Sequence, residues 1–237
     1  MIASLVLVAA FVVLGLPVAL VGIPWRLITG DIMPLYRGSM WVVRTGLHLA
    51  GIRVQIEGLD HVPCGVACIF MSNHVSNLDP PVLLPLIPGR TSVFLKKSLM
   101  KIPLLGFGMR LAEFVPVNRD GTAESAKESE QAAKEVLEKG IHIMTFVEGT
   151  RSRDGRMLPF KKGPFYLAME TAAPCVPVSI SGTETMMRKG SLRLHPGTVR
   201  VVFHSPVYRE DVADRDALMA SVQQRVASGL PEWMRSN

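Results

Sequence analysis

The first 25 residues of the chain are almost all apolar. They contain no charged side chain and consist mainly of Leu, Val, Ala, Ile and Gly. About 24 such residues in a helix are roughly 36 Å long, and the hydrocarbon core of a bilayer is about 30 Å thick. The next stretch, Ile32 to Ala50, mixes apolar residues with Arg37 and Arg44, which is typical of an amphipathic helix at a membrane surface. Residues 1–50 are therefore predicted to form a membrane-associated two-helix motif.

Two modes of membrane insertion are open for this motif. A straight helix would cross the bilayer, whereas the glycines and prolines between residues 15 and 24 would bend it into a half-inserted hairpin. A secretory signal is disfavoured because no basic residue precedes the apolar run, and a buried core helix is disfavoured because such helices rarely exceed about 20 uncharged residues. The first cations, Arg26, Arg37 and Arg44, follow the run, so the positive-inside rule places the remaining chain in the cytoplasm.

From Gly51 onward, short apolar runs alternate with helical stretches, a pattern typical of an α/β domain. No internal repeat, low-complexity tract or linker divides residues 51–237. We expect one domain built on a mixed sheet of about seven strands with helices on its faces. The predicted strands are residues 52–56, 66–71, 91–95, 113–117, 141–146, 176–180 and 199–203. The predicted helices are residues 80–86, 99–111, 122–138, 164–170 and 211–228.

Composition and charge narrow the classes of protein. The 237 residues are 48% hydrophobic and 19% charged, with 26 Lys plus Arg against 20 Asp plus Glu, which excludes a disordered chain, a collagen and a small disulfide-rich scaffold. Basic residues gather in two spans, 90–119 and 151–162, and no aromatic stacking platform accompanies them. We therefore expect contact with an anionic membrane or a phosphorylated substrate, and no nucleic-acid partner.

One polar segment stands between a predicted buried strand and a predicted helix, and it carries His74 and Asp79. Catalytic groups of α/β proteins collect in such strand-exit loops. At about 100° per residue the two side chains do not share a helical face, but a tight turn can fold Asp79 back onto the imidazole. A carboxylate on one ring nitrogen would leave the other nitrogen as a base. Because Asp79 precedes two prolines, it is also a candidate N-cap for the following helix.

A second polar segment follows the predicted strand that ends at Phe146. It contains, in order, Glu148, Gly149, Thr150 and Arg151. The glycine permits a sharp turn, and the hydroxyl and guanidinium groups are donors that bind a phosphate monoester. The alternative is a polar loop closed by an internal ion pair between the glutamate and the arginine. Two further segments are a strand end that presents Arg119 and an apolar run over residues 176–180.

In chain order, these four segments resemble the signature blocks of the glycerolipid acyltransferase family, which includes the 1-acyl-sn-glycerol-3-phosphate acyltransferases. The matching blocks are Asn73-His74-x4-Asp79, Phe114 to Arg119, Phe146 to Ser152 and Val176 to Ile180. The resemblance covers residues 51–203, and the apolar N-terminus is similar to the family's membrane-embedded helices. One departure is Val147, where many members have proline; this removes a rigid residue but no reacting group.

The resemblance implies an O-acyltransferase that moves a fatty acyl group from an acyl thioester to the sn-2 hydroxyl of 1-acyl-glycerol-3-phosphate (lysophosphatidic acid). The product is phosphatidic acid, so the protein would act in phospholipid biosynthesis at the cytoplasmic membrane with its active site facing the cytoplasm. His74 would take the hydroxyl proton as a general base, and Asp79 would orient the imidazole. Lys96 would donate to the tetrahedral oxyanion, with Lys97 and Lys101 as alternatives.

The same resemblance implies an acceptor site around the phosphate of the lyso-lipid. Arg119 and Arg151 would bind the phosphate, and an ionised Glu148 would repel it, so we expect Glu148 to hold an arginine or the glycerol backbone. Gly149 and Thr150 complete the implied site. The donor is acyl-CoA or acyl carrier protein, both of which bring negative charge. No cofactor is implied, and the remaining histidines lack the spacing of metal ligands, so no metal is expected.

Three other interpretations compete with this one. A different lyso-lipid could be the acceptor, because other lyso-lipids use the same motifs. A serine hydrolase would pair His74 with Ser72 or Ser76, but the chain has no G-x-S-x-G elbow. A non-catalytic protein that binds anionic membrane lipid would explain the charge and the apolar N-terminus, but it leaves the polar segments as coincidence.

Overall fold

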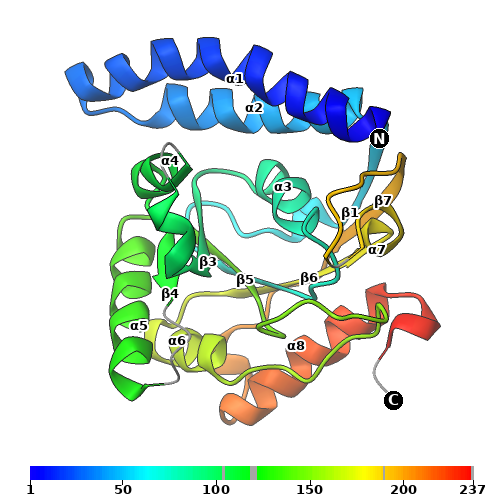
Figure 1. The fold of residues 1–237 in the computed structure, drawn as a ribbon. Helices are drawn as coiled ribbons and strands as arrows, with labels where there is room; N and C mark the ends of the chain where they lie inside the picture. The colour runs from blue at the N-terminus through cyan, green and yellow to red at the C-terminus, as the bar shows by residue number, and fades with distance from the viewer. Residues whose placement is uncertain (103–104, 118–121, 189, 236–237) are drawn as a thin grey trace.

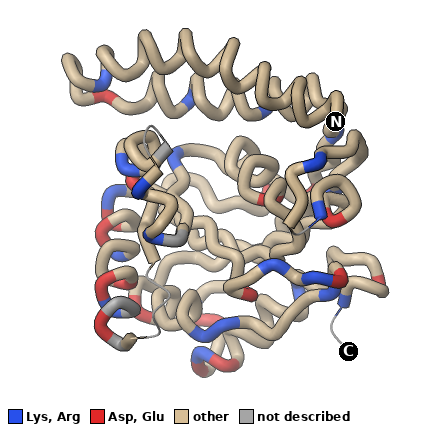
Figure 2. Tube along the Cα trace, viewed as in Figure 1, with Lys and Arg blue, Asp and Glu red and all other residues tan. Residues whose placement is uncertain are grey.

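The computed structural model describes residues 1–102, 105–117, 122–188 and 190–235. Its N-terminus is an antiparallel pair of helices, α1 (Ile2–Thr29) and α2 (Met33–Leu49), which lies across the top of the rest of the molecule (Figure 1). Gly30 adopts φ 78°, a left-handed conformation that ends α1. Figure 2 shows few charged residues along this hairpin and many on the layers below it.

The two helices pack closely because small residues stand where they meet. A Cβ atom added at Gly22 would lie 2.8 Å from Leu35 Cδ1, and one added at Gly46 would lie 2.8 Å from Phe11 Cε1. Helix α1 continues through both of its prolines as one helix, long and apolar enough to cross a membrane by length and composition. The predicted pair of N-terminal helices is therefore present, and the expected bend does not break α1 into two helices.

The centre of the molecule is one seven-stranded mixed sheet with strand order β1-β7-β6-β2-β5-β3-β4. Strands β6, β2, β5, β3 and β4 are parallel, whereas β7 is antiparallel to β6 and parallel to β1. The carboxyl ends of the five parallel strands thus meet at one edge of the sheet. The strands are β1 (Ile52–Glu57), β2 (Ile69–Ser72), β3 (Thr91–Lys96), β4 (Val115–Val117), β5 (His142–Phe146), β6 (Cys175–Ser181) and β7 (Gly197–Phe203).

Helices cover both faces of the sheet (Figure 1). On one face lie α2, α3 (Asp79–Leu83), the 3-10 turn η2 (Leu84–Leu86) and α7 (Thr183–Met186), which share a hydrophobic cluster with the strands. On the other face α5 (Ala123–Glu138), α6 (Gly163–Thr171) and α8 (Arg215–Gly229) bury a second cluster. The other described helical segments are η1 (Leu59–His61), η3 (Lys97–Lys101), α4 (Leu105–Leu111), η4 (Arg209–Asp211) and η5 (Glu232–Met234).

The predicted fold class is confirmed, and each predicted strand overlaps an observed one. The helix predicted over 99–111 is two segments, η3 and α4, and the helix predicted over 211–228 begins only at Arg215. Helix α7 was not predicted, because four residues are too few to show helical periodicity. The division of the chain into a membrane motif and an α/β domain at residue 50 stays a prediction.

Candidate active site

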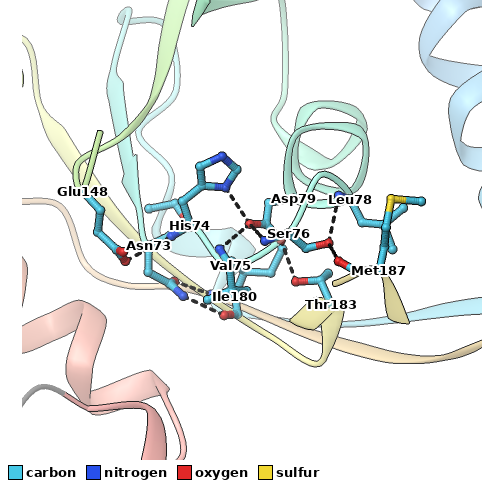
Figure 3. Close-up of polar contacts among 11 residues, drawn as sticks. Asn73, His74, Val75, Ser76, Leu78, Asp79, Glu148, Ile180, Thr183 and Met187 are labelled. Atoms are coloured by element: carbon cyan, nitrogen blue, oxygen red, sulfur yellow. Dashed lines mark hydrogen bonds and ion pairs between the residues drawn. The ribbon is translucent and has the colours of Figure 1, made fainter. Parts of the chain in front are cut away.

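The chain turns sharply at the carboxyl end of β2, and this turn brings His74 onto Asp79 (Figure 3). The distance from His74 Nδ1 to Asp79 Oδ2 is 2.7 Å. The carboxylate is fully buried and the imidazole is 16% exposed. The structure therefore contains the predicted contact, in which a tight turn folds Asp79 back onto the imidazole of His74.

Asp79 is held by four hydrogen bonds. Its Oδ2 accepts from the imidazole and from the backbone N–H groups of Val75 and Ser76, both at 2.8 Å. Its Oδ1 accepts from the hydroxyl of Thr183 at 2.6 Å. The prediction of an N-cap role was wrong: α3 begins at Asp79 itself, and the carboxylate bonds to N–H groups upstream of the helix. These donors replace the water that a buried carboxylate loses.

The contact with Asp79 sets the chemistry of the imidazole. An ionised carboxylate only accepts hydrogen bonds, so Nδ1 is the protonated ring nitrogen and donates a hydrogen bond to Asp79. The lone pair of Nε2, on the side of the ring away from Asp79, is then available to accept a proton. The ring also stacks on Phe146, with centroids 3.9 Å apart and planes 17° from parallel. Phe146 ends β5, the strand next to β2, so the sheet fixes the plane of the imidazole.

The turn that carries His74 is tied to the neighbouring strand β6 and to α7. The side-chain amide of Asn73 donates to Ile180 O and accepts from Ile180 N, each at 2.9 Å, and so extends the β2–β6 ladder by one residue beyond Ser72. Ser76 Oγ donates to Met187 O at 2.8 Å. Ser72 Oγ donates to Asn73 O at 3.1 Å. Because both serine hydroxyls are buried and bonded to backbone carbonyls, neither is placed as a nucleophile for His74.

The second predicted segment lies against the first. Glu148 Oε1 accepts from His74 N at 3.1 Å, and Ser152 N donates to His74 O at 2.9 Å. Both backbone groups of the histidine are thus bonded to the loop that follows β5. Gly149 adopts φ 68°, which confirms the predicted sharp turn, while Thr150 is exposed and Arg151 is half-buried.

The environment of Glu148 differs from the expectation for an ionised, phosphate-repelling carboxylate. The residue is 1% exposed, and burial raises the pKa of its carboxyl to about 8 even though the backbone N–H groups of His74 and Leu158 donate to it. At neutral pH the group is therefore largely a neutral acid. The contacts found for Glu148 are made to backbone N–H groups, and the expectation that it holds an arginine or the lipid stays a prediction.

The structure does not bring every predicted residue together. Lys96 is the last residue of β3, at the same edge of the sheet as His74, and its side chain lies outside the described part of the structure. Lys97 and Lys101 are exposed in η3. Arg119 lies outside the described residues altogether.

Thr183 is a site residue that the sequence pattern does not indicate, and Phe146 has no predicted role beyond ending a strand. Thr183 is 104 positions from Asp79 along the chain and follows an apolar strand that looks purely structural. The signal in the sequence that could have indicated Thr183 is a hydroxyl residue directly after Gly182, at the end of a buried strand.

A cavity of about 660 Å³ opens beside the His74 turn, and Arg153 and Arg188 line it from two different loops. Among the described residues, no group of His, Cys, Asp or Glu is placed to hold a metal ion.

This site lies on a fold that known proteins share. A family model described as Acyltransferase matches residues 53–181, more than half of the chain. The chain therefore belongs to the acyltransferase family. The 1-acyl-sn-glycerol-3-phosphate acyltransferase of Limnanthes douglasii is 36% identical over 161 residues, which are 68% of this chain and 57% of the plant protein. The human 1-acyl-sn-glycerol-3-phosphate acyltransferase alpha is 31% identical over 169 residues, 71% of this chain and 60% of that protein.

A solved structure extends the likeness to almost the whole chain. The 1-acyl-sn-glycerophosphate (LPA) acyltransferase PlsC from Thermotoga maritima superposes with a TM-score of 0.82 at 25% identity, covering 98% of this chain and 95% of that one. The similarity therefore includes the N-terminal helices as well as the sheet. By contrast, the matches to the two curated relatives span about three fifths of their length.

Proposed function

We propose that this protein is a 1-acylglycerol-3-phosphate O-acyltransferase, which transfers an acyl group from a thioester to the sn-2 hydroxyl of lysophosphatidic acid. The observation that carries the proposal is the 2.7 Å contact between His74 and the fully buried Asp79 at the carboxyl edge of the sheet. The names of the similar plant, human and bacterial proteins support the choice of substrate. A thioester is already reactive, so a base for the acceptor hydroxyl is the main chemical requirement.

The proton moves through His74 in both halves of the proposed reaction. Nε2 removes the proton from the sn-2 hydroxyl while that oxygen attacks the thioester carbonyl. The resulting imidazolium is stabilised by Asp79, whose charge is held in place by four donors. When the tetrahedral intermediate collapses, the C–S bond breaks and the thiolate takes that proton. The products are an ester and a free thiol, and no acyl group is attached to the protein.

The loop after β5 is the proposed acceptor site. Arg151 and Arg119 would bind the phosphate, with Gly149 and Thr150 forming the turn beside it. Because Glu148 is neutral near pH 7, it does not repel an approaching phosphate, and its bond to His74 N holds the base in place. Lys96, at the carboxyl end of β3, is the proposed oxyanion donor.

The hairpin gives the proposed enzyme access to its lipid substrate. Helix α1 packs on α2, and α2 rests on a face of the α/β layers (Figure 1). A helix in that position lies along the domain surface, so we propose that the hairpin enters one leaflet from the cytoplasmic side of the inner membrane. Trp25 and Trp41, 48% and 54% exposed, would lie at the headgroup level.

A transfer assay with purified protein tests this proposal. Lysophosphatidic acid and other lyso-lipids are offered with acyl-CoA or acyl carrier protein as the donor, and the products are identified by mass. His74→Ala should abolish transfer while the protein stays folded, whereas the matched change at the exposed His195 should leave the rate unchanged. Full activity in His74→Ala rejects the mechanism. Hydrolysis to free acid without an acceptor indicates a hydrolase, and vesicle binding with no transfer from either donor indicates a lipid-binding protein.

A further inference from the structure

A groove of about 920 Å³ runs beneath α2, between that helix, β1 and the α3–η2 segment; we call it the α2 groove. None of the described residues that line it is acidic. Its charged groups are Arg37 and Arg44 of α2 and Arg53 of β1, and His48 of α2 also lines it. The three arginines and the histidine are all exposed, and no ion pair to them is seen within the described part of the chain. The groove therefore carries uncompensated positive charge.

The two arginines of α2 that line the groove lie on one face of that helix, together with Trp41 and His48. At about 100° per residue, Arg37, Trp41, Arg44 and His48 fall within a sector of roughly 60°. Over their 11-residue separation the stripe is about 16 Å long. Trp41 stands between the two arginines and is 54% exposed. Arginine alternating with tryptophan is typical of protein surfaces at the level of lipid headgroups.

The opposite wall of the α2 groove is apolar apart from Arg53. Ile52, Val54 and Ile56 alternate along β1 and so point to the same face of the sheet, and Ile56 is 42% exposed. Pro85, Leu86 and Ile87 continue this wall. A ligand that matches both walls has an anionic group to bind the arginines of α2 and a hydrocarbon chain to pack along the β1 wall.

We propose that the α2 groove binds one anionic phospholipid of the membrane, with its phosphate on Arg37 and Arg44 and an acyl chain along the β1 wall. The site is distinct from the acyl-transfer site, because neither His74 nor Asp79 lines it. The two sites share α3, which begins at Asp79 and contributes Pro81 and Val82 to the groove. A bound lipid thus packs against the helix that carries the catalytic carboxylate.

Native mass spectrometry of the full chain in detergent tests this site without any acyl transfer. Phosphatidylglycerol and phosphatidylcholine with matched chains are added separately. We expect one phosphatidylglycerol to remain bound and phosphatidylcholine to be lost. The double variant Arg37→Gln/Arg44→Gln should bind phosphatidylglycerol about 30-fold more weakly, which corresponds to about 1 kcal/mol for each basic residue removed.

The matched control is Arg26→Gln/Arg209→Gln, which removes the same charge from one half-buried and one exposed residue outside the α2 groove. This variant should bind phosphatidylglycerol like the wild type. Equal retention of the two lipids by the wild type, or equal weakening in the control and the groove variant, overturns the site. The acyl-transfer rate on detergent-dispersed substrate should be unchanged in the groove variant, so a failed transfer assay and a failed lipid assay are separate results.

A second inference concerns Thr183, and it rests on the proposed function of His74. The residue is fully buried, and its hydroxyl donates to Asp79 Oδ1 while the imidazole and two N–H groups occupy Oδ2 (Figure 3). A carboxylate bonded only through Oδ2 could rotate about its Cβ–Cγ bond. The geometry assigns Thr183 as a positioning residue that fixes the plane of the Asp79 carboxylate and thereby the direction of His74 Nε2.

Comparison of Thr183→Ser with Thr183→Ala tests this role, because both remove the methyl group and only alanine removes the hydroxyl. Serine should keep kcat within about threefold, and alanine should lower kcat about 10- to 100-fold, the loss expected for one hydrogen bond to a charged group. The KM for the acceptor should stay unchanged in both. Thr185→Ala, at an exposed threonine of the same short helix, is the matched control. Equal kcat in the serine and alanine variants overturns the assignment; inactivity of the wild type instead refutes the proposed function.

Discussion

Replacing Glu148 by Gln tests the unusual state of this carboxyl. The side chain is 1% exposed, its Oε1 accepts from His74 N at 3.1 Å, and burial raises its pKa to about 8 from an ordinary 4.5. Glutamine has nearly the same shape, and its amide oxygen can accept the same backbone N–H groups. The variant therefore removes the titration and keeps the acceptor.

The size and sign of the effect follow from proton linkage. Below pH 4.5 the carboxyl is protonated in both the folded and the unfolded protein, so it adds no pH dependence. Between pH 4.5 and 8 the unfolded chain loses the proton and the folded protein keeps it, so the free energy of unfolding falls as the pH rises. A gap of about 3.5 pH units corresponds to about 5 kcal/mol, lost in full by pH 8. At about 2 to 4 °C per kcal/mol, this is a shift of about 10 to 20 °C in Tm.

Melting temperatures of detergent-solubilised protein between pH 5 and pH 9 measure this effect. Relative to the wild type, Glu148→Gln should melt at a similar temperature at pH 5 and about 10 to 20 °C higher at pH 9. Glu138→Gln, at an exposed carboxylate of α5, should follow the wild-type curve at every pH. Parallel wild-type and Glu148→Gln curves across this range would refute the reasoning, because they would mean that the buried carboxyl does not resist ionisation.

Three further substitutions have defined outcomes. Arg151→Ala should raise the acceptor KM at least about tenfold with little change in the donor KM, because one phosphate contact is lost. An unchanged acceptor KM rejects the phosphate role of Arg151. Arg209→Ala is the control. Asn73→Ala should destabilise the fold by about 2 to 6 kcal/mol in denaturant unfolding, because the buried N–H and C=O of Ile180 lose their partners; a loss below about 1 kcal/mol contradicts this. Gly46→Val should lower Tm by pushing α1 away from α2, because a Cβ atom at position 46 would lie 2.8 Å from Phe11 Cε1. Gly15→Ala should not lower Tm, because a Cβ atom at position 15 would lie 3.9 Å from Val42 Cγ1. Equal effects of the two substitutions reject close helix packing as the cause.

Local patterns predicted much of this fold because they act over a few residues. A run of uncharged apolar residues gave the first helix, and short apolar runs bounded by polar loops gave every strand of the sheet. The pairing of His74 with Asp79 was also predictable, since a five-residue separation needs only a tight turn. The N-cap prediction for Asp79 failed because a carboxylate at a helix start can turn to whichever donors lie nearest, and here the imidazole and the N–H groups of Val75 and Ser76 take it.

Local patterns therefore predict the helices and strands, the apolar hairpin and the residue types of the proposed reaction. The tertiary structure alone decided the strand order, with β7 reversed beside β6, because sheet pairing depends on contacts far apart in the chain. It also decided that Thr183 bonds Asp79, that Glu148 is buried against the backbone of His74, and that α2 covers a cationic groove. These features arise where distant segments meet, and burial sets both the partners and the charge of a group only after the chain has folded.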